Sequence, residues 1–289
     1  MTYLNCYAML EQMRYGLNEH SAALMAGTVS GAHFNSRLLF QLNGAQRYLF
    51  ALLKKRMKEH FRVTNSSLAV TSSVITLPDD FGVLELLRDS DGRQIYPISS
   101  KERRRTASSG SDQFYYREGN YLKLDKAGVT GTVTLIYFKR CPELTYGQAQ
   151  AESGALSLVM QSNAKTIVDY YNGVKIENVT DEVTDTISDY TAARVATVGT
   201  TWAEDEWYGT VSILPEEFHQ FIVDLALLRE RKDNPLVQDK PRSVDYQIFQ
   251  DALSETITAM GHGAEDEDPS DIFEDFDPLF YGGGYMDLG

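Results

Sequence analysis

The strongest periodic signal in the chain lies between Asn35 and Phe61. Its apolar residues recur every three or four positions, at Leu38, Leu42, Ala45, Leu49 and Leu52. This spacing places them on one stripe of a long helix. Leu4 to Leu17 predicts a shorter helix, and Ala26 to His33, rich in Gly, Ser and Thr, predicts the loop between the two.

From Ser67 to Tyr137 the apolar period changes to two, which predicts strands. Asp91-Gly92 divides one β-rich run, and Glu118-Gly119-Asn120 and Ala127-Gly128 divide another. Such residues supply the positive φ that tight hairpins require. With usual strand lengths, this region predicts an antiparallel sheet of about four or five strands.

A second β-rich segment spans Ala155 to Ile213. Asn172-Gly173 lies between alternating apolar residues and predicts a hairpin turn. We expect Trp202, Trp207 and Tyr208 to anchor the core of this smaller sheet.

Helical periodicity returns at Pro215 and continues to about Arg231. Pro suits the start of a helix, and Glu216 and Glu217 complement its dipole. Ser243 is then expected to cap a last helix. The predicted fold class is α+β: one long N-terminal helix and two C-terminal helices packed with an antiparallel sheet, a small inserted β segment and an extended C-terminal arm.

This reading divides the chain into four segments. Residues 1–149 hold the N-terminal helices and the antiparallel sheet, and residues 150–213 form the inserted β segment. Residues 214–260 supply the C-terminal helices that complete the helical core, and residues 261–289 form an acidic, aromatic arm.

Charge is distributed unevenly along the chain. The net charge is −14, and Gly261 to Gly289 holds nine acidic residues without Lys or Arg, so the preceding residues carry only −5. Tight nucleic-acid binding needs a concentrated basic surface, and an acidic wall would instead let DNA pass without sticking.

Two short basic clusters stand out against this acidity. Lys54, Lys55 and Arg56 close the long helix, and Arg103, Arg104 and Arg105 lie in a predicted loop. Cations at a helix C-terminus are favoured by the backbone dipole alone. The alternative is a contact patch for an acidic partner or for phosphate.

The C-terminal arm differs from an ordinary solvated tail because it interleaves large apolar residues with its acids. Such residues can anchor the arm in a groove of a partner protein, and the expected anchors are Ile272, Phe273, Phe276, Phe280, Tyr281 and Tyr285. The alternative is that these side chains pack back on their own chain.

No arrangement of residues points to catalysis. The five histidines are scattered, the two cysteines lie in no Cys or Cys/His cluster, and no nucleophile elbow or phosphate loop occurs. We therefore expect a protein that is not an enzyme, with no catalytic residues, metal or cofactor. The sequence contains no apolar run long enough to span a membrane, so we expect no membrane anchor.

The order of the motifs resembles the head-to-tail adaptor proteins of short-tailed bacteriophages. The resemblance rests on the long helix (Leu38 to Phe61) with its L-N-x-A-Q run, on "LPDDFGVLELL" (Leu77 to Leu87), on "FYYREGNYLKL", on "GTVTLIYFKRCPELT" (Gly131 to Thr145) and on "ILPEEFHQFIVDLALLRER" (Ile213 to Arg231). From Leu38 to Arg231, these motifs span about two-thirds of the chain.

The resemblance implies a structural protein of the virion neck, assembled in the host cytoplasm. Twelve copies would form a ring that joins the portal to the tail nozzle or tail tube and takes part in genome ejection, and DNA would pass through the ring without sequence-specific binding. Loops of the β segments would face the tail. Two alternatives stay open: another tail component, such as a nozzle protein, and a virion-associated cell-wall hydrolase.

Overall fold

A computed structural model describes residues 4–17, 35–99, 113–233 and 241–262. The chain forms two compact units, which we call the helical unit (Met1–Met57 and Gly209–Gly289) and the β unit (Lys58–Tyr208). Within the described residues, no helix has the length and apolar character needed to cross a membrane.

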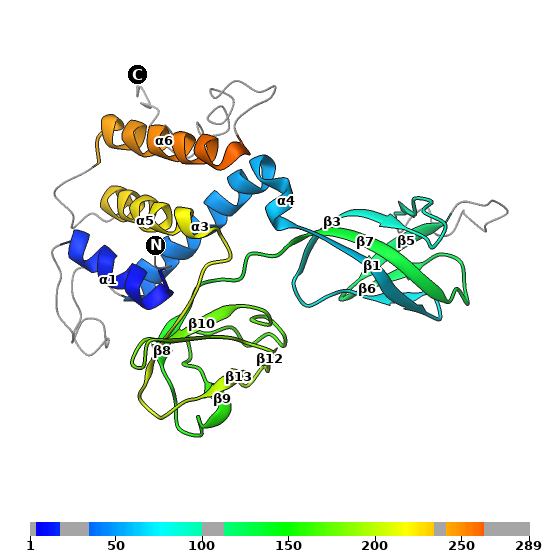
Figure 1. Ribbon diagram of the computed structural model, residues 1–289, viewed down its shortest axis with the longest axis horizontal. Coiled ribbons are helices and arrows are strands. Elements are labelled where there is room, and N and C mark those ends of the chain that lie inside the picture. Colours follow the sequence, from blue (N-terminus) through cyan, green and yellow to red (C-terminus); the bar gives the residue numbers. More distant parts are fainter. Residues whose placement is uncertain (1–3, 18–34, 100–112, 234–240, 263–289) are drawn as a thin grey trace, which may run out of the picture. The chain divides into compact units, whose positions relative to one another are not determined.

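Among the residues that the structure describes, the helical unit contains four α-helices, which are labelled in Figure 1. They are α1 (Cys6–Gly16), α3 (Asn35–Arg56), α5 (His219–Asp233) and α6 (Ser243–Ile257). A 3₁₀ turn, η2 (Glu216–Phe218), leads into α5, and the short π-helix η3 (Thr258–His262) follows α6. The predicted first helix, long helix and two C-terminal helices are therefore all present, with the long helix ending at Arg56, before a separate turn α4 (Lys58–Phe61).

Helix α5 is the centre of the helical unit, since α1, α3 and α6 all contact it. The predicted stripe of α3 is its core face, and Leu38, Leu42, Ala45 and Leu49 are fully buried. From α5, Ile222, Leu225 and Ala226 are equally buried. The periodicity in the sequence thus marks the surfaces that bring α3 and α5 together.

A buried ion pair ties α3 to α5. The Glu230 side chain is fully buried, and both of its carboxylate oxygens accept from Nε of Arg37, at 2.9 and 2.8 Å. Gln41 Nε2 lies 3.5 Å from the same carboxylate. Because a buried carboxylate is stable only when it is paired and hydrogen-bonded, these contacts fix how α3 meets α5.

His219 connects the start of α5 to the N-terminal segment. Its Nδ1 accepts from the backbone N–H of Leu4 at 3.2 Å, and its Nε2 lies 2.9 Å from the carbonyl oxygen of Leu214. The ring is therefore neutral, with its proton on Nε2, because one nitrogen must accept while the other donates. Burial lowers the pKa of His219 below its ordinary value.

The start of α6 differs from the prediction. Ser243 is the first helical residue rather than the cap, and Arg242 is the capping residue. The Asp245 carboxylate accepts from the backbone N–H of Arg242 at 2.6 Å, which is the bond that the third helical residue makes in a capping box. The inner face of α6 buries Phe249, which packs edge-on against Phe221 of α5.

The β unit begins with α4 and a seven-stranded sheet in the order β3-β7-β1-β2-β6-β5-β4. Its strands are β1 (Arg62–Thr71), β2 (Val74–Thr76), β3 (Phe81–Arg88), β4 (Tyr96–Pro97), β5 (Phe114–Glu118), β6 (Tyr121–Leu124) and β7 (Gly131–Lys139). The expected four or five strands were too few, because β2 and β4 are only three and two residues long and carry little periodic signal. All pairings are antiparallel except that of β4 with β5.

Glycine turns occur where the sequence predicted them in this sheet. Glu118 pairs with Tyr121 across a two-residue turn in which Gly119 has a φ of +61°. Gly92 has a φ of +82° in the turn that leads Arg88 back to a bridge with Gln94. These positions favour glycine because a Cβ atom would be strained there.

The remainder of the β unit forms two smaller sheets, in the orders β11-β10-β14-β8 and β12-β13-β9. Their strands are β8 (Tyr146–Gln148), β9 (Ala155–Val159), β10 (Lys175–Asn178), β11 (Val183–Thr186), β12 (Asp189–Tyr190), β13 (Val195–Thr201) and β14 (Trp207–Thr210). Trp202 and Tyr208 are buried in their core as predicted, whereas Trp207 is half-buried and stacks on Tyr146.

The prediction of a hairpin at Asn172-Gly173 is wrong, because no strand directly precedes this turn among the described residues. Gly173 does have a positive φ of +78°, yet the residues before it form turns, and β10 pairs instead with β11. The reason is aromatic packing: Tyr171 is buried against Tyr170 and Tyr190, with ring centroids 4.9 Å apart in both pairs. Burying these rings fixes the segment as a loop rather than a strand.

The architecture is mixed α+β, as predicted, with N-terminal and C-terminal helices and antiparallel sheets. The predicted loop at Ala26 to His33 and the predicted C-terminal arm lie outside the described residues.

The buried ion pair gives a first prediction. Arg37→Ala should lower the free energy of unfolding of the helical unit by about 3 kcal/mol, because it leaves the carboxylate of Glu230 buried without its partner. Urea unfolding followed by circular dichroism at 222 nm measures this loss. The control is Arg62→Ala, which removes a partner of the more exposed Glu85 and should have a smaller effect. Equal losses in the two variants would contradict the role given to Glu230.

His219 gives a second prediction, on pH. Because the pKa of His219 is lowered in the folded protein, its contribution to stability is complete above the unfolded value of 6.5 and is lost as the pH falls below it. His219→Gln keeps one donor and one acceptor but cannot titrate. The melting temperature should therefore fall less between pH 7.5 and 5 in this variant than in the unsubstituted protein. If the melting temperatures of the two proteins fall equally between pH 7.5 and 5, protonation of His219 does not destabilise the fold.

Candidate assembly surfaces

The basic residues at the end of α3 are the part of the predicted contact patch that the structure describes. Lys54, Lys55 and Arg56 form the last turn of the helix. Lys55 is exposed, while Lys54 and Arg56 are half-buried. This position gives them the favourable interaction with the helix dipole that the sequence indicated. Their role in binding a partner stays a prediction.

The other predicted contact residues lie outside the described residues. Arg103, Arg104 and Arg105 fall within residues 100–112. The apolar residues of the arm, Ile272, Phe273, Phe276, Phe280, Tyr281 and Tyr285, fall within residues 263–289. Their role in partner binding therefore stays a prediction.

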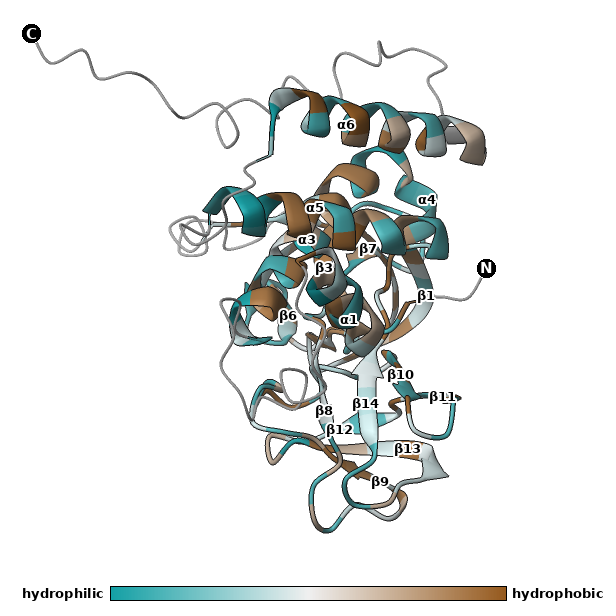
Figure 2. Cartoon of the chain, turned by 90° about the vertical axis from the view of Figure 1, so that its left-hand side faces the viewer, coloured by the Kyte–Doolittle hydropathy of each residue, from teal (hydrophilic) through white to brown (hydrophobic). Residues whose placement is uncertain are grey.

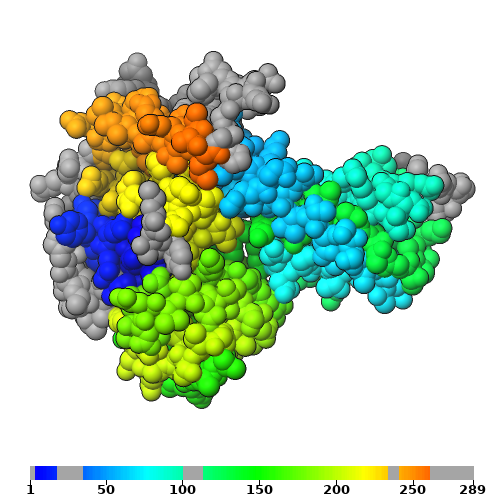
Figure 3. Space-filling view, viewed as in Figure 1, coloured from blue at the N-terminus to red at the C-terminus, as the bar shows by residue number. Residues whose placement is uncertain are grey.

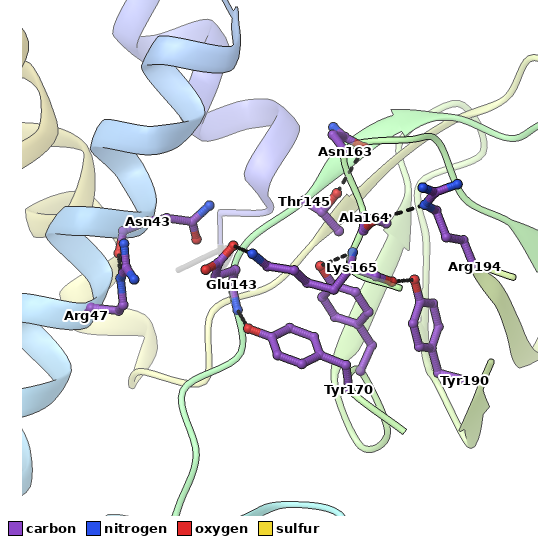
Figure 4. A network of polar contacts seen from close by, with 11 residues as sticks. Asn43, Arg47, Glu143, Thr145, Asn163, Ala164, Lys165, Tyr170, Tyr190 and Arg194 are labelled. Atoms are coloured by element: carbon purple, nitrogen blue, oxygen red, sulfur yellow. Dashed lines mark hydrogen bonds and ion pairs between the residues drawn. The ribbon is translucent and has the colours of Figure 1, made fainter. Parts of the chain in front are cut away.

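A polar network joins the chain after β7 to the loop of the smaller β sheets (Figure 4). Lys165 Nζ forms an ion pair with Glu143 at 2.9 Å, and the backbone N–H of Glu143 donates to the hydroxyl of Tyr170 at 3.2 Å. The amide of Asn163 donates to the carbonyl oxygen of Tyr146 at 2.6 Å. These contacts hold residues separated by about 20 positions along the chain in one rigid loop cluster.

Arg140 anchors the same cluster from the end of β7. Its guanidinium lies over the ring of Tyr170, 5.1 Å from the centroid, and donates to the carbonyl oxygen of Asp169. Burial lowers the pKa of Arg140. Asn172 then reaches back to Asp79, beside the start of β3, at 3.1 Å. The two sheet regions of the β unit are thereby linked through side chains as well as through the backbone.

The tyrosines of this cluster act as hydrogen-bonding groups. Burial raises the pKa of Tyr190 to about 12 and also raises the pKa of Tyr171. Both phenols therefore keep their protons at neutral pH, and Tyr190 donates to the carbonyl oxygen of Lys165 (Figure 4). The hydroxyl of Tyr171 accepts from the backbone N–H of Lys165 at 3.5 Å, so both tyrosines form structural hydrogen bonds to the same residue.

Carboxylates of the β unit are used in the same structural way. Asp185 on β11 accepts from the backbone N–H groups of Thr186, Gly199 and Thr200, and these bonds lower its pKa although its burial acts in the opposite direction. Asp80 accepts from the hydroxyl of Tyr137 at 2.6 Å. Among the described residues, no group of three or more His, Cys, Asp or Glu side chains could hold a metal ion.

The β unit exposes large apolar side chains on strand β9 and on one of its loops. Leu156, at the start of β9, is 55% exposed and has a φ of +60°, a conformation that is strained for a leucine. Ile167 and Val168 are more than half exposed in the loop that the polar network holds. Rigid loops that present apolar side chains are suited to contacts with another protein. Sequence reasoning missed these residues because an exposed leucine or valine has no distinguishing pattern in a strand-rich segment.

The helical unit also exposes apolar residues. Phe40 on α3 is 66% exposed, and Val244 and Ile248 on α6 are 48% and 62% exposed. These residues lie on helices whose other faces build the core. The described surface thus offers several places for protein contacts.

Comparison with known proteins assigns a family to the first half of the chain. Residues 24–155 match the family model described as SU10 adaptor protein. The match contains α3, the whole seven-stranded sheet and β8, and ends where β9 begins. A search of curated proteins found no match.

The match includes the motifs from Leu38 to Thr145 that carried the resemblance, whereas the motif from Ile213 to Arg231 lies beyond it. This order of a long helix followed by strands is the feature that the sequence and the family model share. Residues 24–155 of the chain are therefore similar to the SU10 adaptor protein family, a family of phage head-to-tail adaptors.

Proposed function

We propose that the protein is a ring-forming adaptor of the virion neck, which joins the portal to the tail and surrounds the path of the DNA. The family match over residues 24–155 is the observation that carries this proposal. The fold adds support, because a helical unit and a β unit give one subunit separate surfaces for several partners. Twelve copies per ring is the number that the resemblance implies.

In this proposal the helices supply the body of the ring. Residues 1–149 and 214–260 would form that body, residues 150–213 an inserted β segment, and residues 261–289 a connecting arm. A ring of identical subunits requires two different faces that are complementary to each other and whose repetition closes.

The arm would bind the portal. Its nine acidic residues would guide it to a basic surface, and Ile272, Phe273 and Phe276, with Phe280, Tyr281 and Tyr285, would be its apolar anchors. The modest affinity of each arm is multiplied when many arms bind in parallel on one ring. The basic residues Lys54, Lys55 and Arg56, with Arg103, Arg104 and Arg105, are candidate contacts for a neighbouring subunit or for the arm.

The exposed loops of the β unit would contact the tail nozzle or tail tube. Leu156, Ile167 and Val168 are the described side chains best suited to this, because they are apolar and exposed and lie on strand β9 and on a hydrogen-bonded loop. DNA would pass through the ring without sequence-specific binding, since the chain is acidic overall.

A binding experiment tests the proposed function and the arm together. Purified full-length protein is mixed with the portal of the same virus and imaged by electron microscopy. Rings on the portal are expected, and the proposal fails if neither rings nor portal complexes form.

Two matched variants then separate the contributions of the arm. In the first, the six apolar anchors from Ile272 to Tyr285 become Ser and all acids remain; in the second, the nine acids become Asn or Gln and the anchors remain. We expect the first variant to lose most portal binding and the second to bind more slowly, with a weaker dependence on salt. Unchanged binding by the first variant would remove the arm from the portal contact.

A further inference from the structure

Helix α6 carries apolar residues on two opposite faces. Its inner face buries Phe249, Leu253 and Ile257. Its outer face exposes Val244 and Ile248, and Ala252 and the nearby Ala259 of η3 are exposed as well. Figure 2 shows hydrophobic residues recurring along α6, and Figure 3 shows the helix, in orange, at the surface of the helical unit. A surface helix is normally polar on its outer face, so this second apolar stripe indicates a contact.

The charge of α6 restricts what can cover this stripe. The helix contains Asp245, Asp251 and Glu255 but no Lys or Arg, and Asp251 and Glu255 are exposed. The chain's own C-terminal residues 263–289 follow directly and hold nine acids without a base, so they would repel this surface. A suitable partner therefore combines apolar residues with positive charge.

Helix α3 presents a surface of that kind. Its exposed residues are Ser36, Phe40, Arg47, Ala51 and Lys55. The helix contains five basic residues and no acid. Arg47 also lies close enough to Arg229 of α5 to add to the lowering of the Arg229 pKa, which burial causes in the first place. An acidic partner at this face would relieve the repulsion between the two arginines.

The two exposed stripes match in spacing. On α3, Ser36, Phe40, Arg47 and Ala51 are separated by 4, 7 and 4 positions, and on α6 Val244, Ile248, Glu255 and Ala259 are separated by the same 4, 7 and 4 positions. In a parallel alignment of the helices, Phe40 faces Ile248, Arg47 faces Glu255 and Ala51 faces Ala259. The stripe extends over about 22 Å at the usual rise of a helix. The two alanines allow close approach, and the charged pair lies beside the apolar pair.

We propose that the outer face of α6 in one copy packs in parallel on the exposed face of α3 in the next copy. We assign the contact to a second copy because the inner face of α6 is packed on α5 of its own chain, while Val244 and Ile248 on the outer face are exposed rather than buried against another described helix. Two different faces of one subunit give a head-to-tail interface, which is the kind that closes into a ring. This inference rests on the proposed function and names the subunit contact within it.

A charge exchange tests the pairing of Arg47 with Glu255. Arg47→Glu and Glu255→Arg each place like charges at every interface, and each should weaken the contact by about tenfold. In an equal mixture of the two variants, alternating subunits have opposite charges at every contact, and rings should return. The chain with both substitutions should also assemble. Assembly with the portal of the same virus is followed by mass photometry and electron microscopy.

A cysteine pair provides a second test that does not depend on Arg47. Phe40→Cys with Ile248→Cys, in a Cys141→Ser background, should form disulfide-linked chains between copies after mild oxidation of the assembled protein. The matched control is Phe40→Cys with Val83→Cys, since Val83 is 54% exposed but lies on β3 of the β unit. A ladder of oligomers is expected for the first pair alone on a non-reducing gel.

The outcomes distinguish this inference from the function on which it rests. Rings that form normally in both single charge variants, with no disulfide ladder from the α3 and α6 pair, would overturn the proposed contact and leave the adaptor function intact. If the Ile248→Asp variant forms normal rings that no longer bind the portal, the apolar stripe of α6 binds the portal rather than α3. This result would also overturn the proposed subunit contact. Absence of rings and of portal binding in the unsubstituted protein would overturn both.

Discussion

The contact between α3 and α5 is the interaction on which the helical unit depends. These helices come from segments far apart in the chain, and the ion pair between Arg37 and Glu230 spans 193 residues. The whole β unit lies between them in the sequence. Helices α1 and α6 also contact α5. The paired helices α3 and α5 therefore form the centre on which the other two helices pack.

The sequence predicted the elements whose signal is local. The leucine stripe of α3, the helices that became α5 and α6, and the turns at Gly92 and Gly119 depend on neighbouring residues and are present as expected. The hairpin at Asn172-Gly173 failed because Tyr170 and Tyr171 are held by residues elsewhere in the fold. The pairing of Arg37 with Glu230 could not be predicted for the same reason: each side chain alone looks like an ordinary charge on a helix.

The candidate surfaces show the same division. Lys54, Lys55 and Arg56 were identified as a basic cluster from composition, and the structure places them at a helix end. Phe40 and Ile248 were not predicted as contact residues. Hydrophobic periodicity predicts that a helix has an apolar face, but it does not predict which apolar side chains remain exposed in the folded protein. In α6 both faces are apolar, and only the exposed fractions separate the face that packs on α5 from the outer one. The match of residues 24–155 to the adaptor family model gives this separation a proposed use in assembly, which is the subunit contact between α6 and α3.

In the sequence, the β unit separates the two segments that form the helical unit, and this order has a consequence for synthesis of the protein. Helix α3 ends at Arg56 and its partner α5 begins only at His219, after the entire β unit. At bacterial translation rates the ribosome needs about ten to thirty seconds to cover that interval. During this time α3 can contact α1 but lacks α5, the helix against which its leucine stripe is buried. We therefore expect the nascent chain to expose apolar surface, and to be prone to aggregation, until α5 emerges.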